Sequence, residues 1–396
     1  MLETVASARS SALGAEGWDD LVVLCAANSW DDVKLADRHM AERLTAHAPV
    51  LYVDPPISHL TRINNPAVAA STRRPHLRLV GPRIARYTPI VAPKPFHPLM
   101  TPLTERLVRR QLAGAVRRLG GSVSAVVSTW LFVDAYGVCG ERRRVYWWQD
   151  DPVGAAVHWG ASAERLGRAE QRLARASDFV AAVNEDVVKR WRDQGVRAEY
   201  LPNGCDAPYF AAVEDADPAT DVDLERPIAG FVGHLNSRTE LALLEAIANW
   251  GISLLLIGPR ATDFEPERFD ALARRPNVRY IGPRRFEELP AYFKVIDVGL
   301  VPYADTPFNR GSFPMKTLEY LAAGRAVVST PLPAVRSLQS NLIALADSPE
   351  AFAAAVAQQA KTARDADLVR RRRAFAAEHS WARRAELLAQ WLDLPV

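Results

Sequence analysis

Short apolar runs alternate with helical patterns along the first half of the chain. Residues 21–27, LVVLCAA, form a continuous apolar run of strand length, which is typical of a strand that is buried on both faces. A helical pattern at 33–46 and a second apolar run at 50–53 follow it. Strand, helix and strand with short connections predict a parallel α/β sheet. Further strands are predicted at 77–80, 87–91, 124–128, 145–148 and 179–183, with helices at 103–119, 162–176 and 185–194.

The alternation stops at residues 206–226 and restarts at 228. Asp, Ala and Pro without apolar periodicity fill 206–226, which predicts a structureless linker. Two βα series joined by a linker predict an α/β protein with two Rossmann-like domains that face a cleft. Ligands of such sheets bind beyond the carboxyl ends of the strands. The second series is predicted to contain strands at 228–232, 252–257, 278–281, 298–301 and 326–329, and helices at 238–250, 286–294, 349–359 and 381–392.

Length and composition fit this two-domain organisation. A chain of 396 residues is too long for one ordinary core, and its 48% hydrophobic and 24% charged residues are typical of a globular protein. The formal net charge of +3 gives no argument for nucleic-acid binding. Cys25, Cys139 and Cys205 lack metal-ligand spacing, which fits a reducing compartment. Since no apolar leader and no run of about 18 apolar residues is present, we expect a cytoplasmic protein.

The predicted helix 103–119 is basic and amphipathic. Its pattern is typical of an arginine-rich solvated face on a packed helix, and a peripheral contact with the inner face of a membrane is the alternative. The run at 370–373 is likewise interpreted as a solvated helix face. The arginines of helix 103–119 are Arg106, Arg109, Arg110, Arg117 and Arg118.

The stretch 308–324, FNRGSFPMKTLEYLAAG, carries the clearest candidate chemistry. Its first half is predicted to be a loop, Pro314 suits the start of a helix, and Gly324 suits its end. Lys316 and Glu319 then lie three residues apart on one helix face. A helix N-terminus with a lysine suits a phosphate, and the carboxylate one turn deeper suits two sugar hydroxyls. Phosphate together with a diol indicates a nucleotide.

At this point the chain resembles a known family. GPRRFEELPAYFKVIDVGLVPY followed by PMKTLEYLAAGRAVVSTPLPAV is similar to the donor-binding half of GT-B glycosyltransferases, in particular the retaining family four enzymes that build bacterial cell-surface polysaccharides and glycolipids. SDFVAAVNEDVVKRW and YLPNGCDAPYF resemble the end of the family's first domain, with Pro202-Asn203-Gly204 and Asp206 matching P-N-G-x-D. The first domain matches more loosely, through LYVDPP and WWQDD. The resemblance covers most of 21–392.

The resemblance implies a division of labour between two domains. Residues 1–205 would bind the acceptor, 206–226 would link the domains, and 227–380 would bind a nucleotide-diphosphate sugar. The terminal helix, within 381–396, would pack back on the first domain. Neither a metal nor a cofactor besides the donor substrate is implied, and the expected partners are the donor and a glycan, lipid-linked or small-molecule acceptor.

The donor-site residues follow from the resemblance position by position. Glu319 matches the glutamate that holds the ribose hydroxyls, and Gly311 stands where the family's sugar-reading glutamate is expected. Lys316 stands where the related polysaccharide enzymes have a lysine, and it would be a cation for the diphosphate. The backbone of Ser312, Phe313, Pro314 and Met315 would bind the diphosphate as well.

A second donor-side loop begins at Gly233. His234 takes the position of the family's arginine there, and Arg238 is the best candidate for the remaining diphosphate cation. Fixed cations can stabilise a leaving diphosphate without a metal, and arginine offers it a planar fork. The alternatives are a packed histidine at 234 and an ordinary helix-opening arginine at 238.

The acceptor side is expected beside the strands of the first domain. Asp150 and Asp151, just past VYWWQ, would meet the acceptor hydroxyl or simply cap the next segment. Asn28, Ser29 and Trp30 end the first strand; the Trp30 ring would stack on a sugar or pack on the next helix. A front-face mechanism, proposed for the retaining class, needs no protein base.

Other functions remain open at this point. Asp215-Ala-Asp217 and Asp221-Val-Asp223 imitate a metal-binding Asp-x-Asp motif, but they lie in the predicted linker and not after a buried strand. A nucleotide-sugar epimerase on the same fold is the enzyme alternative. A two-lobed solute-binding protein is the non-enzyme alternative, although that class is exported.

Overall fold

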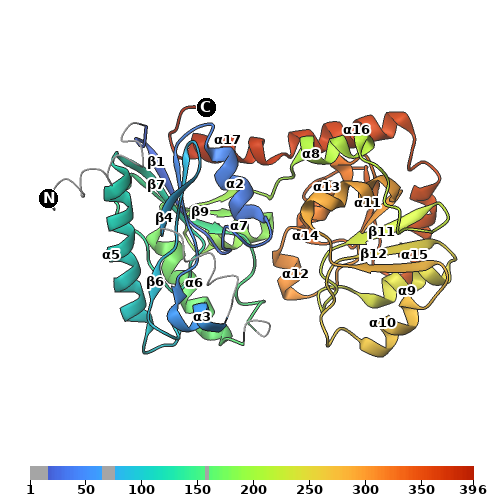
Figure 1. The fold of residues 1–396 in the computed structure, drawn as a ribbon, viewed down its shortest axis with the longest axis horizontal. Helices are drawn as coiled ribbons and strands as arrows, with labels where there is room; N and C mark the ends of the chain where they lie inside the picture. Colours follow the sequence, from blue (N-terminus) through green and yellow to red (C-terminus); the bar gives the residue numbers. More distant parts are fainter. Residues whose placement is uncertain (1–16, 65–75, 157–159) are drawn as a thin grey trace. The chain divides into compact units, whose positions relative to one another are not determined.

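The chain forms two compact α/β units. The computed structural model describes residues 17–64, 76–156 and 160–396. The first unit comprises the described parts of Met1–Ala182, with Asp186–Leu201 and Trp381–Val396. The second unit comprises Val183–Glu185 and Pro202–Ser380. Each unit is built on its own sheet (Figure 1).

The first unit contains an eight-stranded sheet in the order β10-β9-β8-β7-β1-β2-β5-β4. Its pairs are parallel except that β4 runs antiparallel to β5, so the prediction of a purely parallel sheet is wrong at this edge. The strand predicted at 87–91 is two strands, β5 and β6, and β6 pairs with β3 outside the main sheet. The strands are β1 Leu21–Cys25, β2 Val50–Val53, β3 Ile57–Ser58, β4 Leu77–Gly81, β5 Ile84–Tyr87, β6 Ile90–Val91, β7 Val123–Ser128, β8 Arg143–Trp148, β9 Phe179–Ala182 and β10 Ala198–Tyr200.

The described helices of the first unit lie where the sequence predicted them, except His59–Asn64, which was not predicted. The strands β1 and β7 are buried along their whole length, which explains the unbroken apolar sequence of β1. The terminal helix α17 packs against α2, where the Trp381 ring stacks on the His39 ring with centroids 5.6 Å apart. The helices are α2 Ala36–Leu44, α3 His59–Asn64, α5 Thr101–Leu119, α6 Ala163–Ala176, α7 Glu185–Asp193 and α17 Trp381–Trp391.

The second unit has the strand order of a Rossmann fold. Its six parallel strands lie in the order β13-β12-β11-β14-β15-β16, so the chain reverses direction across the sheet between β11 and β14. A ligand is expected at such a switch point, beyond the carboxyl ends of these two strands. The strands are β11 Ile228–Val232, β12 Ser253–Ile257, β13 Val278–Gly282, β14 Val298–Val301, β15 Ala326–Ser329 and β16 Ile343–Leu345.

Helices cover both faces of the second sheet. Figure 1 shows α11 and α13 on one face and α9 and α15 on the other. The buried side chains of α9 and α15 form one apolar core with β11 and β12, which includes Phe231, Leu244, Leu256 and Phe352. The helices are α8 Ala207–Ala211, η2 Ala212–Asp215, α9 Leu241–Asn249, α10 Pro266–Ala273, η3 Phe286–Glu288, α11 Leu289–Val295, α12 Pro307–Gly311, α13 Met315–Ala322, α14 Pro333–Arg336, α15 Pro349–Ala360 and α16 Ala366–Glu378.

Tyr320 fixes the orientation of α13 on this sheet. Its hydroxyl accepts a hydrogen bond from the Val232 N–H at 2.9 Å and donates one to the Gly230 carbonyl at 3.1 Å. The strand β11 pairs with β14 only at Ala229 and Gly230. The Tyr320 hydroxyl therefore bonds to backbone groups of β11 at the point where the pairing with β14 stops. The ring lies against Gly299, where a Cβ atom would come within 2.2 Å of it. This position therefore requires glycine.

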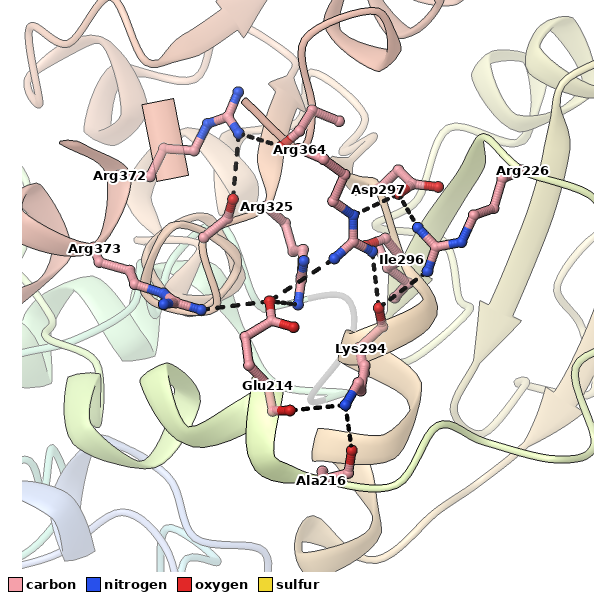
Figure 2. A network of polar contacts seen from close by, with 12 residues as sticks. Glu214, Ala216, Arg226, Lys294, Ile296, Asp297, Arg325, Arg364, Arg372 and Arg373 are labelled. Atoms are coloured by element: carbon pink, nitrogen blue, oxygen red, sulfur yellow. Dashed lines mark hydrogen bonds and ion pairs between the residues drawn. The ribbon is translucent and has the colours of Figure 1, made fainter. Parts of the chain in front are cut away.

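The predicted linker at 206–226 is an ordered part of the second unit. It contains α8 and η2, and the prediction of a structureless segment is wrong. Glu214 of η2 accepts a hydrogen bond from the buried Arg325 at 2.6 Å (Figure 2). Lys294 donates to the carbonyls of Glu214 and Ala216 at 2.7 and 2.8 Å. These contacts hold the segment against α11 and against Arg325, which directly precedes β15.

The same network contains a second carboxylate, Asp297. It accepts hydrogen bonds from Arg226 at 2.6 Å and from Arg364 at 2.8 Å (Figure 2).

Burial lowers the pKa of Arg325 to about 10, and the nearby Arg364 acts in the same direction. Arg372 is 1% exposed and donates to two backbone carbonyls, so the run at 370–373 is not wholly a solvated face.

The second acidic pair that imitates a metal motif, Asp221 and Asp223, forms hydrogen bonds and ion pairs with arginines. Asp221 accepts hydrogen bonds from Arg284 and from the Tyr292 hydroxyl, both at 2.9 Å. Asp223 forms an ion pair with Arg279. Among the described residues, no group of three or more His, Cys, Asp or Glu side chains is arranged to hold a metal ion.

Replacing Tyr320 tests the anchoring of α13. We expect Tyr320→Phe to lower the free energy of unfolding of the second unit by about 1–3 kcal/mol, because two buried backbone groups lose their partner. Urea unfolding of the full chain would measure it. Tyr280→Phe is the matched control, since that hydroxyl donates a single bond to Gly258 in a partly buried setting. An equal loss in both variants would contradict the anchoring role.

Candidate active site

The loop after β11 begins with a close backbone approach. Gly233 donates its N–H to the Ile257 carbonyl at 2.9 Å, and its own carbonyl lies where a Cβ on Gly258 would come within 1.9 Å. Gly258 has a φ of 133°, so glycine is required there on two grounds. His234 follows and is exposed to solvent. The histidine predicted at this strand end is therefore accessible and is not a packed core residue.

Arg238 is clamped by Asn309. Its Nε donates to Asn309 Oδ1 at 2.9 Å, and Asn309 Nδ2 donates back to the Arg238 carbonyl at 2.9 Å. The guanidinium also lies over the Phe308 ring, 4.5 Å from its centroid. Asn309 is fully buried and further bonds the Ala304 carbonyl at 2.8 Å. The sequence predicted Arg238 but missed Asn309, whose buried amide makes the arginine a fixed group.

The stretch 308–324 folds differently from the prediction in its first half. Residues Pro307–Gly311 form the helix α12, capped by Thr306, and not a loop. Gly311 is its buried last residue, and Ser312 follows with its hydroxyl donating to the Phe308 carbonyl at 2.9 Å. Phe313 and Pro314 are buried, and Pro314 is the N-cap of α13, as predicted.

Lys316 and Glu319 lie together at the start of α13. Their side chains form an ion pair, with 24% and 9% of each side chain exposed. The first turn of a helix of this length presents backbone N–H groups without intrahelical partners, so the local field favours an anion beside Lys316. Gly324, with a φ of 76°, ends the helix as predicted.

Tyr209 is a second residue near the candidate site, beside Glu319, that the sequence did not indicate. Its hydroxyl donates to the Phe286 carbonyl at 2.6 Å, and its ring stacks on the Phe286 ring with centroids 4.4 Å apart. Burial raises the pKa of Tyr209 to about 12, with Glu287 and Glu319 adding to the rise. The residue was missed because it lies in the segment predicted to be a linker.

In the first unit, Asp37 joins the two predicted acceptor loops. It is fully buried at the start of α2 and accepts hydrogen bonds from the backbone and side-chain N–H groups of Asn28 at 3.1 and 2.9 Å. Its other oxygen accepts one from Gln149 at 2.6 Å. Burial raises the pKa of this carboxyl, and these donors oppose the rise. Asn28 and the Gln149-Asp150-Asp151 loop are therefore neighbours, as their places after two parallel strands predict.

A buried arginine holds the rest of the loop after β1. Arg86 on β5 donates to Asp54 and Asp31, both at 2.6 Å, and to the Ser29 hydroxyl at 3.1 Å. The Trp30 N–H donates to Asp54 at 2.9 Å. Burial raises the pKa of Asp54, and Arg86 opposes this. Ser29 and Trp30 thus have fixed backbone positions.

The Trp30 ring packs within the first unit. It meets the Tyr52 ring edge-on with centroids 5.1 Å apart, and the Arg38 guanidinium of α2 lies 4.6 Å from its centroid. Only 9% of Trp30 is exposed. Of the two interpretations from the sequence, packing on the next helix describes this geometry.

The two predicted acceptor aspartates have different settings. Asp151 accepts hydrogen bonds from the N–H groups of Val153 and Gly154 at 2.9 and 3.0 Å, so it caps the segment that follows. Asp150 is exposed. Asp150 is therefore the more exposed of the two.

Two Rossmann-like α/β units, each on its own largely parallel sheet, have the architecture of the GT-B class of fold, as the sequence predicted. Residues 226–361 match the family model described as Glycosyl transferases group 1. This match and the ones below confirm the resemblance to glycosyltransferases.

A curated relative agrees with the family match. A Bacillus subtilis protein, provisionally named teichuronic acid biosynthesis glycosyltransferase TuaH, is 30% identical over 184 residues, which are 44% of this chain and 46% of TuaH. The chain thus spans about half the length of the curated relatives it matches.

Solved structures extend the similarity of fold over nearly the whole chain. Sucrose-phosphate synthase from Thermosynechococcus elongatus has a TM-score of 0.69 and 16% identity, covering 94% of this chain and 98% of its own. Anabaena Alr3699/HepE, solved with UDP and glucose, has a TM-score of 0.62 and 14% identity, covering 95% and 99%. At these identities the comparison establishes the fold.

Removing the buried guanidinium tests how the acceptor loop is held. We expect Arg86→Met to lower the free energy of unfolding of the first unit by about 3–5 kcal/mol, because Asp54 is left buried without its cation. Chemical unfolding of the full chain, followed by tryptophan fluorescence, would measure it. The control is Arg83→Met, which removes an exposed arginine with one bond to the Thr45 carbonyl. A loss below about 1 kcal/mol for Arg86→Met would contradict this role.

Proposed function

We propose that this protein transfers a sugar from a nucleotide-diphosphate sugar to a hydroxyl acceptor, with retention and without a metal. The observation that carries the proposal is the geometry at the switch point of the second sheet. There the clamped Arg238 follows β11, and the Lys316–Glu319 pair begins the helix α13 that follows β14 and α12. The position of this geometry within the matched residues 226–361 supports it.

The chemistry of transfer requires stabilisation of the leaving diphosphate. Arg238 supplies a planar guanidinium whose Nε is already occupied by Asn309, so its terminal nitrogens are the groups for phosphate oxygens. Lys316 and the first turn of α13 supply a point charge and backbone dipoles. Because these groups are fixed before the reaction, they stabilise the developing charge with little reorganisation.

The ribose and the sugar would be recognised by different residues. Glu319 is nearly buried and would accept the ribose hydroxyls, while its ion pair with Lys316 orients it. Gly311 has no side chain to offer the transferred sugar, so recognition of that sugar would depend on other groups. Uridine diphosphate sugars are the first donors to test, because Alr3699/HepE was solved with UDP.

The acceptor would bind at the loops of the first unit. Asn28 and the Gln149–Asp151 loop share Asp37, and Asp150 is exposed beside them. The similarity to TuaH supports a precursor of a cell-surface polysaccharide as the acceptor. In a front-face reaction, the leaving phosphate would take the proton of the acceptor hydroxyl, so Asp150 would orient the acceptor without serving as an obligatory base.

Substitution of Glu319 separates the two halves of the proposed site. We expect Glu319→Ala to weaken nucleotide binding about 10- to 100-fold, since hydrogen bonds to a charged group contribute about 1.5–3 kcal/mol. Asp151→Asn is expected to leave this affinity unchanged. Calorimetric titration with the nucleoside diphosphate would measure both, and Glu319→Gln would separate the loss of charge from the loss of shape. Comparable losses for Glu319→Ala and Asp151→Asn, or none, would contradict the assignment.

We further propose a peripheral membrane contact beside α5. The apolar face of α5 is buried through Val108, Leu112 and Val116, and its arginines other than Arg109 are exposed. Leu99 and Leu103, at the start of this helix, are 83% and 43% exposed. No helix in the described ranges is both long and apolar enough to cross a membrane. Exposed leucines beside arginines favour contact with an anionic bilayer surface.

Vesicle binding tests this contact. We expect wild-type protein to sediment with phosphatidylglycerol vesicles and Leu99→Ser/Leu103→Ser to lose most of that binding, because the buried apolar area is lost. Val33→Ser/Leu79→Ser is the control, since both residues are exposed elsewhere in the same unit. Equal binding of all three proteins would contradict a contact at this helix.

A further inference from the structure

An arginine-lined hollow lies on the first unit between α6 and α7. Its volume is about 600 Å³, which is in the range of small-molecule sites. Four arginines line it, and Glu170 is the one carboxylate among the residues that line it. Its neutral polar members are Gln171 and Gln194. The arginines are Arg168, Arg172, Arg175 and Arg190.

Three of these arginines form a stripe along one face of α6. Arg168, Arg172 and Arg175 follow one another at spacings of four and three residues, so they lie one above the other on the helix. Like charges at such spacings destabilise a helix by a few tenths of a kcal/mol per pair. The stripe is therefore unfavourable on its own and becomes favourable when an anion lies beside it.

The fourth arginine is held rigidly on the opposite side. Arg190 of α7 donates to Glu170 at 2.8 Å, and its guanidinium lies 5.0 Å from the centroid of the Trp191 ring. Glu170 is 4% exposed and also accepts from the Trp148 indole at 2.5 Å. The Nε of Arg190 is buried without a hydrogen-bond partner. The floor of the hollow is thus fixed, while 36% of the Arg190 side chain remains exposed.

The lone carboxylate leaves the hollow with a net charge of +3, from four arginines against Glu170. Arg168 has an additional partner in Glu164, on the exposed side of α6. Arg172 donates a long hydrogen bond to the Leu131 carbonyl, at 3.3 Å. Several planar guanidiniums that line one space suit the multiply charged oxygens of a phosphate better than those of a single carboxylate.

We infer that this hollow binds a phosphate ester, independently of the donor site. All of its lining residues belong to the first unit, whereas the proposed diphosphate groups belong to the second. The phosphate would lie between the α6 stripe and Arg190, and Gln171 and Gln194 would bond the remainder of the ligand. A soluble phosphate ester and the headgroup of an anionic lipid present the same chemistry here.

Binding of two probes to the full chain tests this site and separates the two sources. Glycerol 3-phosphate, titrated calorimetrically, represents a soluble ester, and phosphatidylglycerol vesicles represent a headgroup. The vesicle arm uses the Leu99→Ser/Leu103→Ser background, so that the contact beside α5 does not contribute. We expect the chain with its natural hollow residues to bind at least one probe. We expect Arg172→Gln/Arg175→Gln to weaken that binding at least tenfold.

The matched control is Arg192→Gln/Arg197→Gln, which removes the same charge from exposed positions outside the hollow. We expect this control, and the affinity of every variant for the donor nucleotide, to remain unchanged. Binding of glycerol 3-phosphate would identify a soluble ligand, and binding of vesicles alone would identify a lipid headgroup. Absence of binding to both probes, or equal losses in the hollow and control variants, would overturn the inference. Neither of these outcomes would contradict nucleotide binding by the second unit.

Discussion

The hydroxyl of Tyr320 is the contact on which the donor half of this molecule depends. It satisfies the N–H of Val232 and the carbonyl of Gly230 at the place where β11 and β14 separate. The same separation opens the switch point at which a ligand can bind. Because Tyr320 directly follows Glu319, fixing its ring against Gly299 also fixes the face of α13 that carries Lys316 and Glu319. One side chain thereby couples the register of the sheet to the position of the candidate site.

In both units, buried polar side chains hold the polar loop that follows the first strand. In the second unit, the amide of Asn309 fixes Arg238 through reciprocal hydrogen bonds. In the first unit, Asp37 and Arg86 hold the loop after β1 through several bonds each. Buried polar groups with all these partners make the loops rigid, and rigid loops lower the reorganisation that accompanies binding and reaction.

The sequence predicted the elements that depend on local pattern and missed those that depend on distant partners. The unbroken apolar strands and the start and end of α13 were predicted because each is encoded by neighbouring residues. The antiparallel direction of β4 and the helix α12 were missed, since strand direction and a five-residue helix leave little periodic signal. The polar segment at 206–226 was misassigned because Glu214 is ordered by arginines that lie more than a hundred residues away in the sequence.

The candidate site shows the same division. Glu319, Lys316 and Arg238 were found through their spacing and through the family resemblance, whereas Asn309, Tyr209 and Asp37 were not. Their amide, phenol and carboxyl are recognisable only once burial and partners are known. Trp30 illustrates the converse: the sequence left two roles open, and the Arg38 and Tyr52 side chains that cover its ring decide for packing.

The central claim is that the second unit binds a nucleotide-diphosphate sugar at the switch point between β11 and β14. Calorimetric titration of the full chain with uridine, guanosine, adenosine and deoxythymidine diphosphates, and with their sugars, tests it most directly. We expect saturable binding of at least one diphosphate, weakened when Arg238 is replaced by glutamine. Absence of binding across the whole panel would contradict it.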